Sequence, residues 1–353
     1  MNIKINKKTI GPGKPVYIIA EMSANHAMSF NKALRIIKAA ADSGADAVKI
    51  QTYTPDTMTI DCENKYFKIK GTVWAGKNLY RLYQEAFTPW QWHPRLKKAC
   101  DSLGLDFFST PFDFTSVDYL EKMKVPAYKV ASFELVDIPF LKKVAATGKP
   151  IIISTGMASR PEIDEAVQTV LNEGNRKIAL LKCTSAYPAP SKEMNLNTIP
   201  DLSKVYGFPV GLSDHSLGSA VAVASIALGA CIIEKHLTLS RKDPGPDCSF
   251  STEPAEFRTM VSDIRTAEKA LGKVSYELTE KQKENRVFRR SVFVVKDIFK
   301  GEKFSKDNIR SIRPGHGLHP RYWERVLGKK ARKDIKKGTP LGWNMIEGSP
   351  LNP

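Results

Sequence analysis

Residues 231–239 read CIIEKHLTL, an apolar run that ends in three consecutive ionisable side chains, Glu234, Lys235 and His236. A short run of this kind, rich in isoleucine, is typical of a buried β-strand. Successive side chains of a strand alternate between its two faces, so Glu234 and His236 share one face and Lys235 points the other way. We therefore expect Lys235 to form an outward ion pair and not to act in catalysis.

Seven similar segments precede this one, each short, apolar and bounded by Gly, Pro or polar residues. The eight segments are VYIIAEMS (16–23), AVKIQTY (47–53), LDFFSTP (105–111), AYKVAS (127–132), PIIISTG (150–156), IALLKCTS (178–185), PVGLSDHS (209–216) and CIIEKHL (231–237). The stretches between them are long enough for helices. Residues 29–45, for example, have helical apolar spacing, a cap at Ser29 or Asn31 and a stop at Gly44.

Eight alternations of strand and helix predict an α/β fold, a parallel sheet closed into a (β/α)8 TIM barrel. No G-x-G-x-x-G follows the first strand, which weakens a dinucleotide-binding alternative. The long gap at 54–104 predicts an aromatic-rich insertion at the catalytic end, and 253–272 reads as the closing helix. We expect the barrel over 1–280, a charged linker over 281–290 and a small β-rich domain over 291–353.

The net charge of +17 is the one unusual bulk property, and it is concentrated near the C-terminus. From residue 281 onward there are 19 Lys and Arg against 7 Asp and Glu, a net +12. A solvated basic surface is the simplest reading, anionic substrates or an acidic partner come next, and nucleic acid is the weakest. We expect neither a nucleic-acid nor a membrane partner.

The N-terminus has no apolar stretch of signal-peptide length, and no run is long enough to span a membrane, which predicts a cytoplasmic protein. The five cysteines are an odd number without metal-like spacing, and we expect reduced thiols. They are Cys62, Cys100, Cys183, Cys231 and Cys248.

Active sites of TIM barrels lie at the carboxyl ends of the strands. Every predicted strand has polar residues there. They are Glu21 and Ser23; Lys49, Gln51 and Tyr53; Ser109 and Thr110; Lys129 and Ser132; Ser154 and Thr155; Lys182, Thr184 and Ser185; Ser213, Asp214 and His215; Glu234, Lys235 and His236. The sequence thus predicts one polar site built from all eight strands.

Two of the six histidines, His215 and His236, end consecutive strands. Neighbouring strands lie about 5 Å apart, so the two imidazoles can converge on one ion. Either histidine alone would more often be structural, and the prediction depends on the pair. Without an obvious third protein ligand, coordination positions stay open, which suits a catalytic ion of the Mn²⁺, Co²⁺ or Zn²⁺ type that also takes substrate oxygens.

Lys49 and Lys129 lie among apolar residues, where an unpaired ammonium is costly. Together with Thr110, Ser132 and Ser154 they form a set of cations and hydroxyl groups suited to a phosphate and a carboxylate on one small ligand. The structural alternative is that the lysines pair with acidic residues, of which Glu21, Glu134 and Asp214 are the candidates.

Several motifs together resemble the sialic acid synthase family, also called nonulosonate synthases, over nearly the whole chain. In order they are IIAEMSANH (18–26), AVKIQTY, STPFD (109–113), YKVAS, ISTGMAS (153–159), GLSDHS (211–216), EKHLTL (234–239) and GPDCSFSTEP (245–254). Residues 291–346, with RSIRPGHGLHP, resemble the antifreeze-like (SAF) domain that ends these enzymes. EMSANH and the insertion are most similar to the branch that makes pseudaminic acid.

The resemblance implies a condensation of phosphoenolpyruvate with an amino sugar, here 2,4-diacetamido-2,4,6-trideoxy-β-L-altropyranose, to give a nine-carbon α-keto acid and phosphate. It also implies a divalent cation (Mn²⁺, Co²⁺ or Mg²⁺) and a domain-swapped homodimer. The matching positions for phosphoenolpyruvate are Lys49, Thr110, Lys129, Ser132, Ser154 and Ser213. Those for the sugar are Gln51, Tyr187, Asp247 and Arg313, the last reaching from the SAF domain of one subunit into the barrel of the other.

By the same resemblance, His215 and His236 match the metal ligands, and Glu21 matches an active-site carboxylate. Glu21 and Glu234 are the candidate acid/base residues, and the sequence does not choose between them. Ser185 stands where sialic acid synthases carry Asn, and Cys248 where many carry His. Sugar contacts at those two places are therefore in doubt.

Three alternatives stay open from the sequence. The first is an N-acetylneuraminate or legionaminate synthase. The second is a metal-dependent aldolase or another barrel enzyme that uses phosphoenolpyruvate. The third is a polyanion-binding protein on a barrel scaffold, which predicts binding that weakens steeply with salt.

Overall fold

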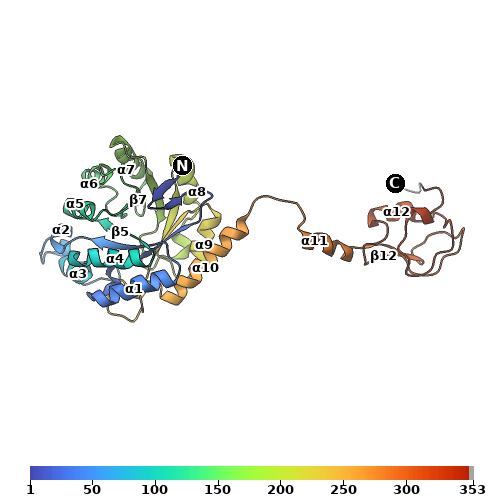
Figure 1. Ribbon diagram of the computed structural model, residues 1–353, viewed down its shortest axis with the longest axis horizontal. Helices are drawn as coiled ribbons and strands as arrows, with labels where there is room; N and C mark the ends of the chain where they lie inside the picture. Colours follow the sequence, from blue (N-terminus) through green and yellow to red (C-terminus); the bar gives the residue numbers. More distant parts are fainter. Residues whose placement is uncertain (350–353) are drawn as a thin grey trace. The chain divides into compact units, whose positions relative to one another are not determined.

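Eight parallel strands form a closed barrel in the computed structural model, which describes residues 1–349 (Figure 1). Their order around the barrel is β10-β3-β4-β5-β6-β7-β8-β9, so each strand pairs with its neighbours in sequence and β10 closes onto β3. The strands are β3 (Tyr17–Glu21), β4 (Ala47–Thr52), β5 (Asp106–Pro111), β6 (Tyr128–Val130), β7 (Ile151–Ser154), β8 (Ile178–Cys183), β9 (Val210–Asp214) and β10 (Ile232–His236). The predicted TIM barrel and its eight strands are confirmed.

One main helix follows each strand and packs outside the barrel (Figure 1). These helices are α1 (Phe30–Asp42), α4 (His93–Ser102), α5 (Phe114–Lys122), α6 (Ile138–Ala145), α7 (Arg160–Asn172), α8 (Thr198–Tyr206), α9 (Ala220–Ala227) and α10 (Pro254–Leu271). Ser29 caps α1 by accepting a hydrogen bond from the Lys32 amide, as its place before the apolar repeat predicts. The closing helix α10 ends just before Gly272, where the sequence places it.

Side-chain alternation divides the barrel interior into two layers. At the amino ends of the strands the inward residues are apolar and form a single buried cluster with members such as Tyr17, Ile19, Phe108 and Ile232. Two residues further along each strand, the same inward face becomes polar. Tyr17 and Ile19, for instance, are followed on the same face by Glu21. The apolar layer therefore lies directly beneath the polar layer and closes the bottom of the cavity.

An N-terminal hairpin seals the amino end of the barrel. β1 (Ile3–Ile5) and β2 (Lys8–Ile10) pair antiparallel, and Ile3, Ile5 and Ile10 are buried in the interior cluster. This hairpin was not among the predicted elements, although IKINKKTI alternates apolar and polar residues with the period of a strand. It supplies apolar side chains where the barrel would otherwise open to water.

The insertion predicted in the 54–104 gap is present between β4 and α4; we call residues 53–92 the β4–α4 insertion. It contains α2 (Pro55–Met58), a 3-10 turn at Lys65–Phe67, α3 (Leu79–Ala86) and a second 3-10 turn at Trp90–Trp92. Short 3-10 helices also occur at Ser23–His26, Ser191–Glu193 and Cys248–Phe250. All three lie in loops that follow barrel strands.

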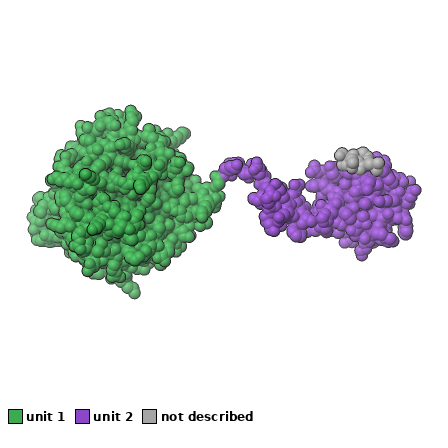
Figure 2. Space-filling model, in the orientation of Figure 1, with its two compact units in different colours: residues 1–272 green, residues 273–353 purple. Residues whose placement is uncertain are grey.

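The chain divides into two compact units, residues 1–272 and residues 273 onward (Figure 2). The second unit contains α11 (Glu280–Glu284), a 3-10 turn at Asn285–Phe288, β11 (Ser291–Val294), β12 (Ile309–Ile312), a turn at Pro320–Tyr322, α12 (Trp323–Val326) and a turn at Trp343–Met345. It has its own small apolar core, with Phe304 and Ile309 among the members. Residues 350–353, the end of the predicted 291–353 domain, lie outside the described residues.

Within residues 1–349, the structure contains no helix with the length and apolar character needed to cross a membrane. The five cysteines are unpaired thiols, and all but Cys62 are buried.

Candidate active site

A small cavity at the carboxyl ends of the strands brings together twelve of the fourteen predicted site residues. They are Glu21, Lys49, Gln51, Thr110, Lys129, Ser132, Ser154, Tyr187, Ser213, His215, Glu234 and His236. The cavity has a volume of about 60 Å³, which holds a few water molecules.

Two predicted residues lie elsewhere. Asp247 is buried behind the wall, where its Oδ2 accepts hydrogen bonds from Ser23 Oγ at 2.5 Å and from the Ala24 amide at 3.3 Å. Ser23 Oγ in turn accepts a bond from Gln51 Nε2 at 2.8 Å. Asp247 thus holds a cavity residue in place through Ser23. Arg313 is exposed in the second unit.

Two lysines and two glutamates form the charged centre of the cavity. Lys49 Nζ lies 2.7 Å from Glu21 Oε2 and 3.6 Å from Glu234 Oε1, and it donates to Thr110 Oγ1 at 3.1 Å. Lys129 Nζ lies 3.9 Å from Glu234 Oε1 and donates to Ser154 Oγ at 2.6 Å. The structural alternative for Lys49 is therefore present, since it pairs with Glu21. With Glu21 and Thr110 bound, Lys49 keeps one ammonium hydrogen able to bind an anionic ligand.

The two glutamates differ in how many cations surround them. Burial raises the pKa of Glu21, the nearby charge of Glu234 raises it further, and Lys49 offsets only part of this. Burial also acts to raise the pKa of Glu234, but Lys129, Lys49 and His215 together outweigh it and lower the pKa. Glu21 is therefore the better proton donor and Glu234 the better carboxylate, a division that sequence alone did not make.

The two imidazoles lie side by side, with ring centroids 5.4 Å apart and planes at 68°. His215 Nδ1 is 3.1 Å from the carbonyl oxygen of Thr184, which can only accept, so Nδ1 carries a hydrogen. Burial lowers the pKa of His215, but the hydrogen bond and charge of Cys183 outweigh it and raise the pKa, so Nε2 becomes a metal ligand when the imidazole gives up its proton. Burial, and then the positive charges of His215 and Lys49, hold the pKa of His236 well below its usual value. His236 is thus a neutral imidazole, the form that binds metals.

These residues fit a divalent cation. Among the residues described, His236 Nδ1 and Glu234 Oε2 are buried side-chain atoms without a hydrogen-bond partner, an arrangement that a bound group would relieve. The hydrogen bond from His215 to a backbone carbonyl is the second-layer contact typical of metal-binding histidines. No cluster of three or more His, Cys, Asp or Glu ligands occurs in residues 1–349, so an ion here would keep open positions.

Four residues near the site were not among the predicted catalytic, substrate-binding or metal-binding residues. Phe112, Phe133 and Cys183 line the cavity. Burial raises the pKa of the Cys183 thiol, but hydrogen bonding and charge from His215 lower it to about 7. Burial raises the pKa of Glu134 to about 7, although the charge of Lys129 opposes this. Strand alternation already places Cys183 inward, two residues after Leu181, whereas Glu134 is on a loop.

Several polar strand-end residues face away from the cavity, which corrects the prediction that all of them form one site. Ser109 instead bonds to Thr52 Oγ1 at 2.6 Å, behind the sheet. Lys235 Nζ forms the predicted outward ion pair, with Asp214 Oδ2 at 2.6 Å, and both side chains are buried. The physical reason is the two-residue period, which turns every second side chain toward the surrounding helices.

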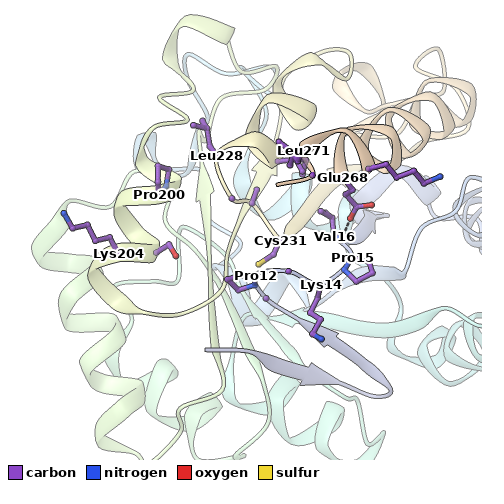
Figure 3. A pocket seen from close by; sticks show the side chains of 18 residues that line it. Pro12, Lys14, Pro15, Val16, Pro200, Lys204, Leu228, Cys231, Glu268 and Leu271 are labelled. Carbon is purple, nitrogen blue, oxygen red and sulfur yellow. Dashed lines mark hydrogen bonds between the residues drawn. The ribbon is translucent and has the colours of Figure 1, made fainter. Parts of the chain in front are cut away.

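A larger cavity of about 820 Å³ lies at the opposite, amino end of the barrel. Figure 3 shows Pro12, Val16, Cys231 and Leu271 around it, and the ends of Lys14 and Lys204 directed away from its centre. The Glu268 carboxylate at its edge already accepts a hydrogen bond from the Val16 amide. The convergent charged groups are at the carboxyl end, and we place the chemistry there.

Comparison with known proteins supports the family resemblance. The NeuB family model matches residues 36–276, and the SAF domain model matches residues 289–347. The pseudaminic acid synthase of Campylobacter jejuni subsp. jejuni serotype O:2 is 46% identical over 328 residues, 93% of this chain and 96% of that protein. The pseudaminic acid synthase of Helicobacter pylori is 43% identical over 337 residues, 95% of this chain and 99% of that protein.

A solved structure gives the same result for the fold. The N-acetylneuraminic acid synthetase of Leptospira borgpetersenii serovar Hardjo-bovis, in complex with citrate, superposes with a TM-score of 0.72 at 34% identity, over 81% of this chain and 95% of that one. Synthases of legionaminic acid and of N-acetylneuraminate 9-phosphate are more distant relatives than the pseudaminic acid synthases.

Proposed function

This chain belongs to the NeuB family of sialic acid synthases, and from that premise we propose that it condenses phosphoenolpyruvate with 2,4-diacetamido-2,4,6-trideoxy-β-L-altropyranose to give pseudaminic acid and phosphate. It is then a phosphoenolpyruvate-dependent transferase. The observation that carries the proposal is the convergence of two lysines, two glutamates and two imidazoles in one cavity at the carboxyl ends of the strands.

The lysine side of the cavity suits phosphoenolpyruvate. Lys49 and Lys129 are both buried, and each already holds a hydroxyl group, Thr110 and Ser154 respectively. Ammonium and hydroxyl donors in a buried site bind phosphate and carboxylate oxygens strongly, because little water competes. Burial and the charge of Lys49 together lower the pKa of Lys129, although Glu234 opposes them. A bound anion would stabilise the charged form of Lys129.

The imidazole side suits the sugar carbonyl. His215 and His236 would hold a divalent cation, which when bound supplies Lewis-acid activation of the open-chain aldehyde. Tyr187 lies against His215 with ring centroids 4.3 Å apart, which supports entry of the carbonyl end of the sugar between this aromatic ring and the two lysines. We infer that an aldehyde bound there would lie next to C3 of phosphoenolpyruvate.

The proton transfers follow from the division between the two glutamates. Attack by C3 forms the new carbon–carbon bond and leaves positive character at C2, and the aldehyde oxygen takes a proton from Glu21, the residue with the raised pKa. Water adds at C2 and gives its proton to the Glu234 carboxylate. Cleavage of the bond between C2 and the phosphate oxygen then releases phosphate, which takes up the proton held by Glu234. The new C2 hydroxyl returns a proton to Glu21 and becomes the keto group of the α-keto acid.

One assay tests this function. Purified protein is incubated with phosphoenolpyruvate, Mn²⁺ and a panel of amino sugars, and phosphate release is followed. We expect release with the diacetamido trideoxy sugar. Release with N-acetylmannosamine alone would indicate the sialate reaction, release with 2,4-diacetamido-2,4,6-trideoxymannose alone the legionaminate reaction, and silence with every sugar would overturn the proposal.

Glu134 provides a stability test of the buried site. In the unfolded chain a glutamate ionises near pH 4.3, whereas in the fold the pKa of Glu134 is about 7. Between these values the folded state binds more protons, so stability present at low pH is lost as pH rises toward 7, by about 3 kcal/mol in total. We expect Glu134→Gln to remove this loss, so its stability relative to the parent protein should increase from pH 4 to pH 7. Urea unfolding of both proteins across that range measures the difference, and a constant difference would contradict the assignment.

Three further statements are proposals that the family resemblance supports. They are the divalent cation (Mn²⁺, Co²⁺ or Mg²⁺), a domain-swapped homodimer in which Arg313 contacts the sugar, and a cytoplasmic location. Analytical ultracentrifugation tests the dimer. Replacing Arg313 by alanine should raise the KM for the sugar more than the KM for phosphoenolpyruvate.

A further inference from the structure

The aromatic side chain Trp74 of the β4–α4 insertion packs behind the imidazole pair. Its ring centroid lies 5.8 Å from that of Tyr187 and 6.1 Å from that of Phe250. Tyr187 stacks on His215 at 4.3 Å, and Phe250 meets His236 edge-on at 5.4 Å. Trp74 therefore contacts both of the aromatic rings that flank the two imidazoles.

Trp74 also connects the insertion to the loop after β10. Its Nε1 donates a hydrogen bond to the carbonyl oxygen of Pro246 at 2.9 Å. The next residue, Asp247, accepts from Ser23, which accepts from Gln51. Gln51 Nε2 lies 3.2 Å from Glu21 Oε1, so a continuous series of contacts extends from Trp74 to the cavity carboxylate.

We propose that Trp74 is a positioning residue for the sugar, acting through Tyr187 and the Pro246–Asp247 segment. The inference rests on the proposed function and goes beyond it, since it assigns the insertion a part in sugar binding. Trp74 does not line the cavity itself, whereas Tyr187 does. Its contacts reach the imidazole side of the site, and the hydroxyl partners of Lys49 and Lys129 come from β5 and β7 instead.

This arrangement predicts that Trp74 affects one substrate and not the other. Trp74→Ala removes two aromatic contacts and one hydrogen bond, and frees the Tyr187 ring on its outer side. We expect the KM for the sugar to rise about 10- to 100-fold, with the KM for phosphoenolpyruvate changing less than about 2-fold. Trp74→Phe keeps a ring at this place and should recover most of the sugar affinity.

The insertion offers a matched control in Trp90. It too is half-buried and donates from Nε1 to a backbone carbonyl, that of Tyr53 at 3.0 Å, but its ring packs on Tyr119. Trp90→Ala should lower stability without separating the two KM values. A general loss of folding would affect both variants alike.

A double-variant cycle tests the route through Tyr187. If Trp74 acts by holding Tyr187, then Trp74→Ala should change the sugar KM less than about 3-fold further in a Tyr187→Ala background. Full additivity of the two changes would overturn the proposed route. Equal shifts in both substrate KM values, or none, would overturn the positioning role.

A measurement without turnover keeps this inference separate from the proposed function. Hydrogen exchange of the intact protein should show faster exchange in the segments around Tyr187 and Asp247 for Trp74→Ala, and no such change for Trp90→Ala. Unchanged exchange in those segments overturns the positioning role whether or not the sugar panel gives activity. If the parent protein uses a different sugar from the panel, the KM comparison is made with that sugar.

Discussion

Replacing His215 or His236 by alanine should lower metal-dependent phosphate release by about 10³-fold or more. The two imidazoles lie 5.4 Å apart by ring centroid; His215 Nδ1 is held by the Thr184 carbonyl, and His236 Nδ1 has no hydrogen-bond partner. Lewis-acid activation contributes several kcal/mol to a reaction of this type, and about 4 kcal/mol corresponds to a 10³-fold change in rate. Steady-state phosphate release with saturating Mn²⁺ measures the effect.

Binding of Mn²⁺ in the absence of substrates gives an independent measurement for the same variants. Titration of each purified variant with Mn²⁺ should show weakened or absent binding, even without substrates. His93→Gln is a suitable control, since His93 is also buried and bonds to Thr52 Oγ1 at 2.9 Å, away from the cavity. Full turnover and normal Mn²⁺ binding in both alanine variants would contradict the metal role of the histidines.

Replacing Lys49 by methionine should damage both stability and catalysis. Lys49 contacts Glu21 at 2.7 Å and Glu234 at 3.6 Å in a buried environment. Removing one partner of a buried ion pair costs about 3–5 kcal/mol, because the remaining carboxylates are left close together and uncompensated. The same change removes an ammonium group from the proposed phosphoenolpyruvate-binding site, and we expect kcat/KM for phosphoenolpyruvate to fall about 10³-fold.

A second variant separates the two effects of Lys49. In the double variant Lys49→Met with Glu21→Gln, an uncharged amide replaces the carboxylate that has lost its cation. Much of the lost stability should therefore return in urea unfolding. Turnover cannot be the readout here, because Glu21 is the proposed proton donor; binding of phosphoenolpyruvate, measured by calorimetry, should stay weak, since the cation is still missing. If the double variant recovers phosphoenolpyruvate affinity together with stability, Lys49 serves only to neutralise Glu21, and the substrate role is wrong.

The sequence predicted most of the cavity because strand periodicity carries the information. In the four-residue stretch from Ile18 to Glu21, alternation alone decides that Glu21 points inward, and the same count applies to Lys49, Lys129 and Glu234. Where the whole list of strand-end residues was treated as one site, Ser109 was misplaced with respect to the cavity, whereas the outward ion pair of Lys235 was predicted correctly. The two-residue period of a strand already places Ser109 on the outward face, because its neighbours Phe108 and Thr110 point inward.

The side-chain directions of loop residues could not be predicted from strand alternation. Glu134, Asp247 and Trp74 lie outside the strands, where no period fixes the direction of a side chain. Asp247 reaches Ser23 across more than two hundred residues, and Trp74 reaches Pro246 across a similar distance in the chain. Such contacts depend on how β10 closes onto β3 and on how the insertion folds back.

The sequence by itself determined the (β/α)8 architecture, the inward polar layer and the neighbouring imidazoles, because each follows from local periodicity and from the order of the strands. Only the tertiary structure decided which glutamate has the higher pKa, because the pKa of a buried carboxyl depends on every charge around it. Glu234 faces Lys49, Lys129 and His215, whereas Glu21 pairs with Lys49 alone. Those distances exist only once the barrel is closed.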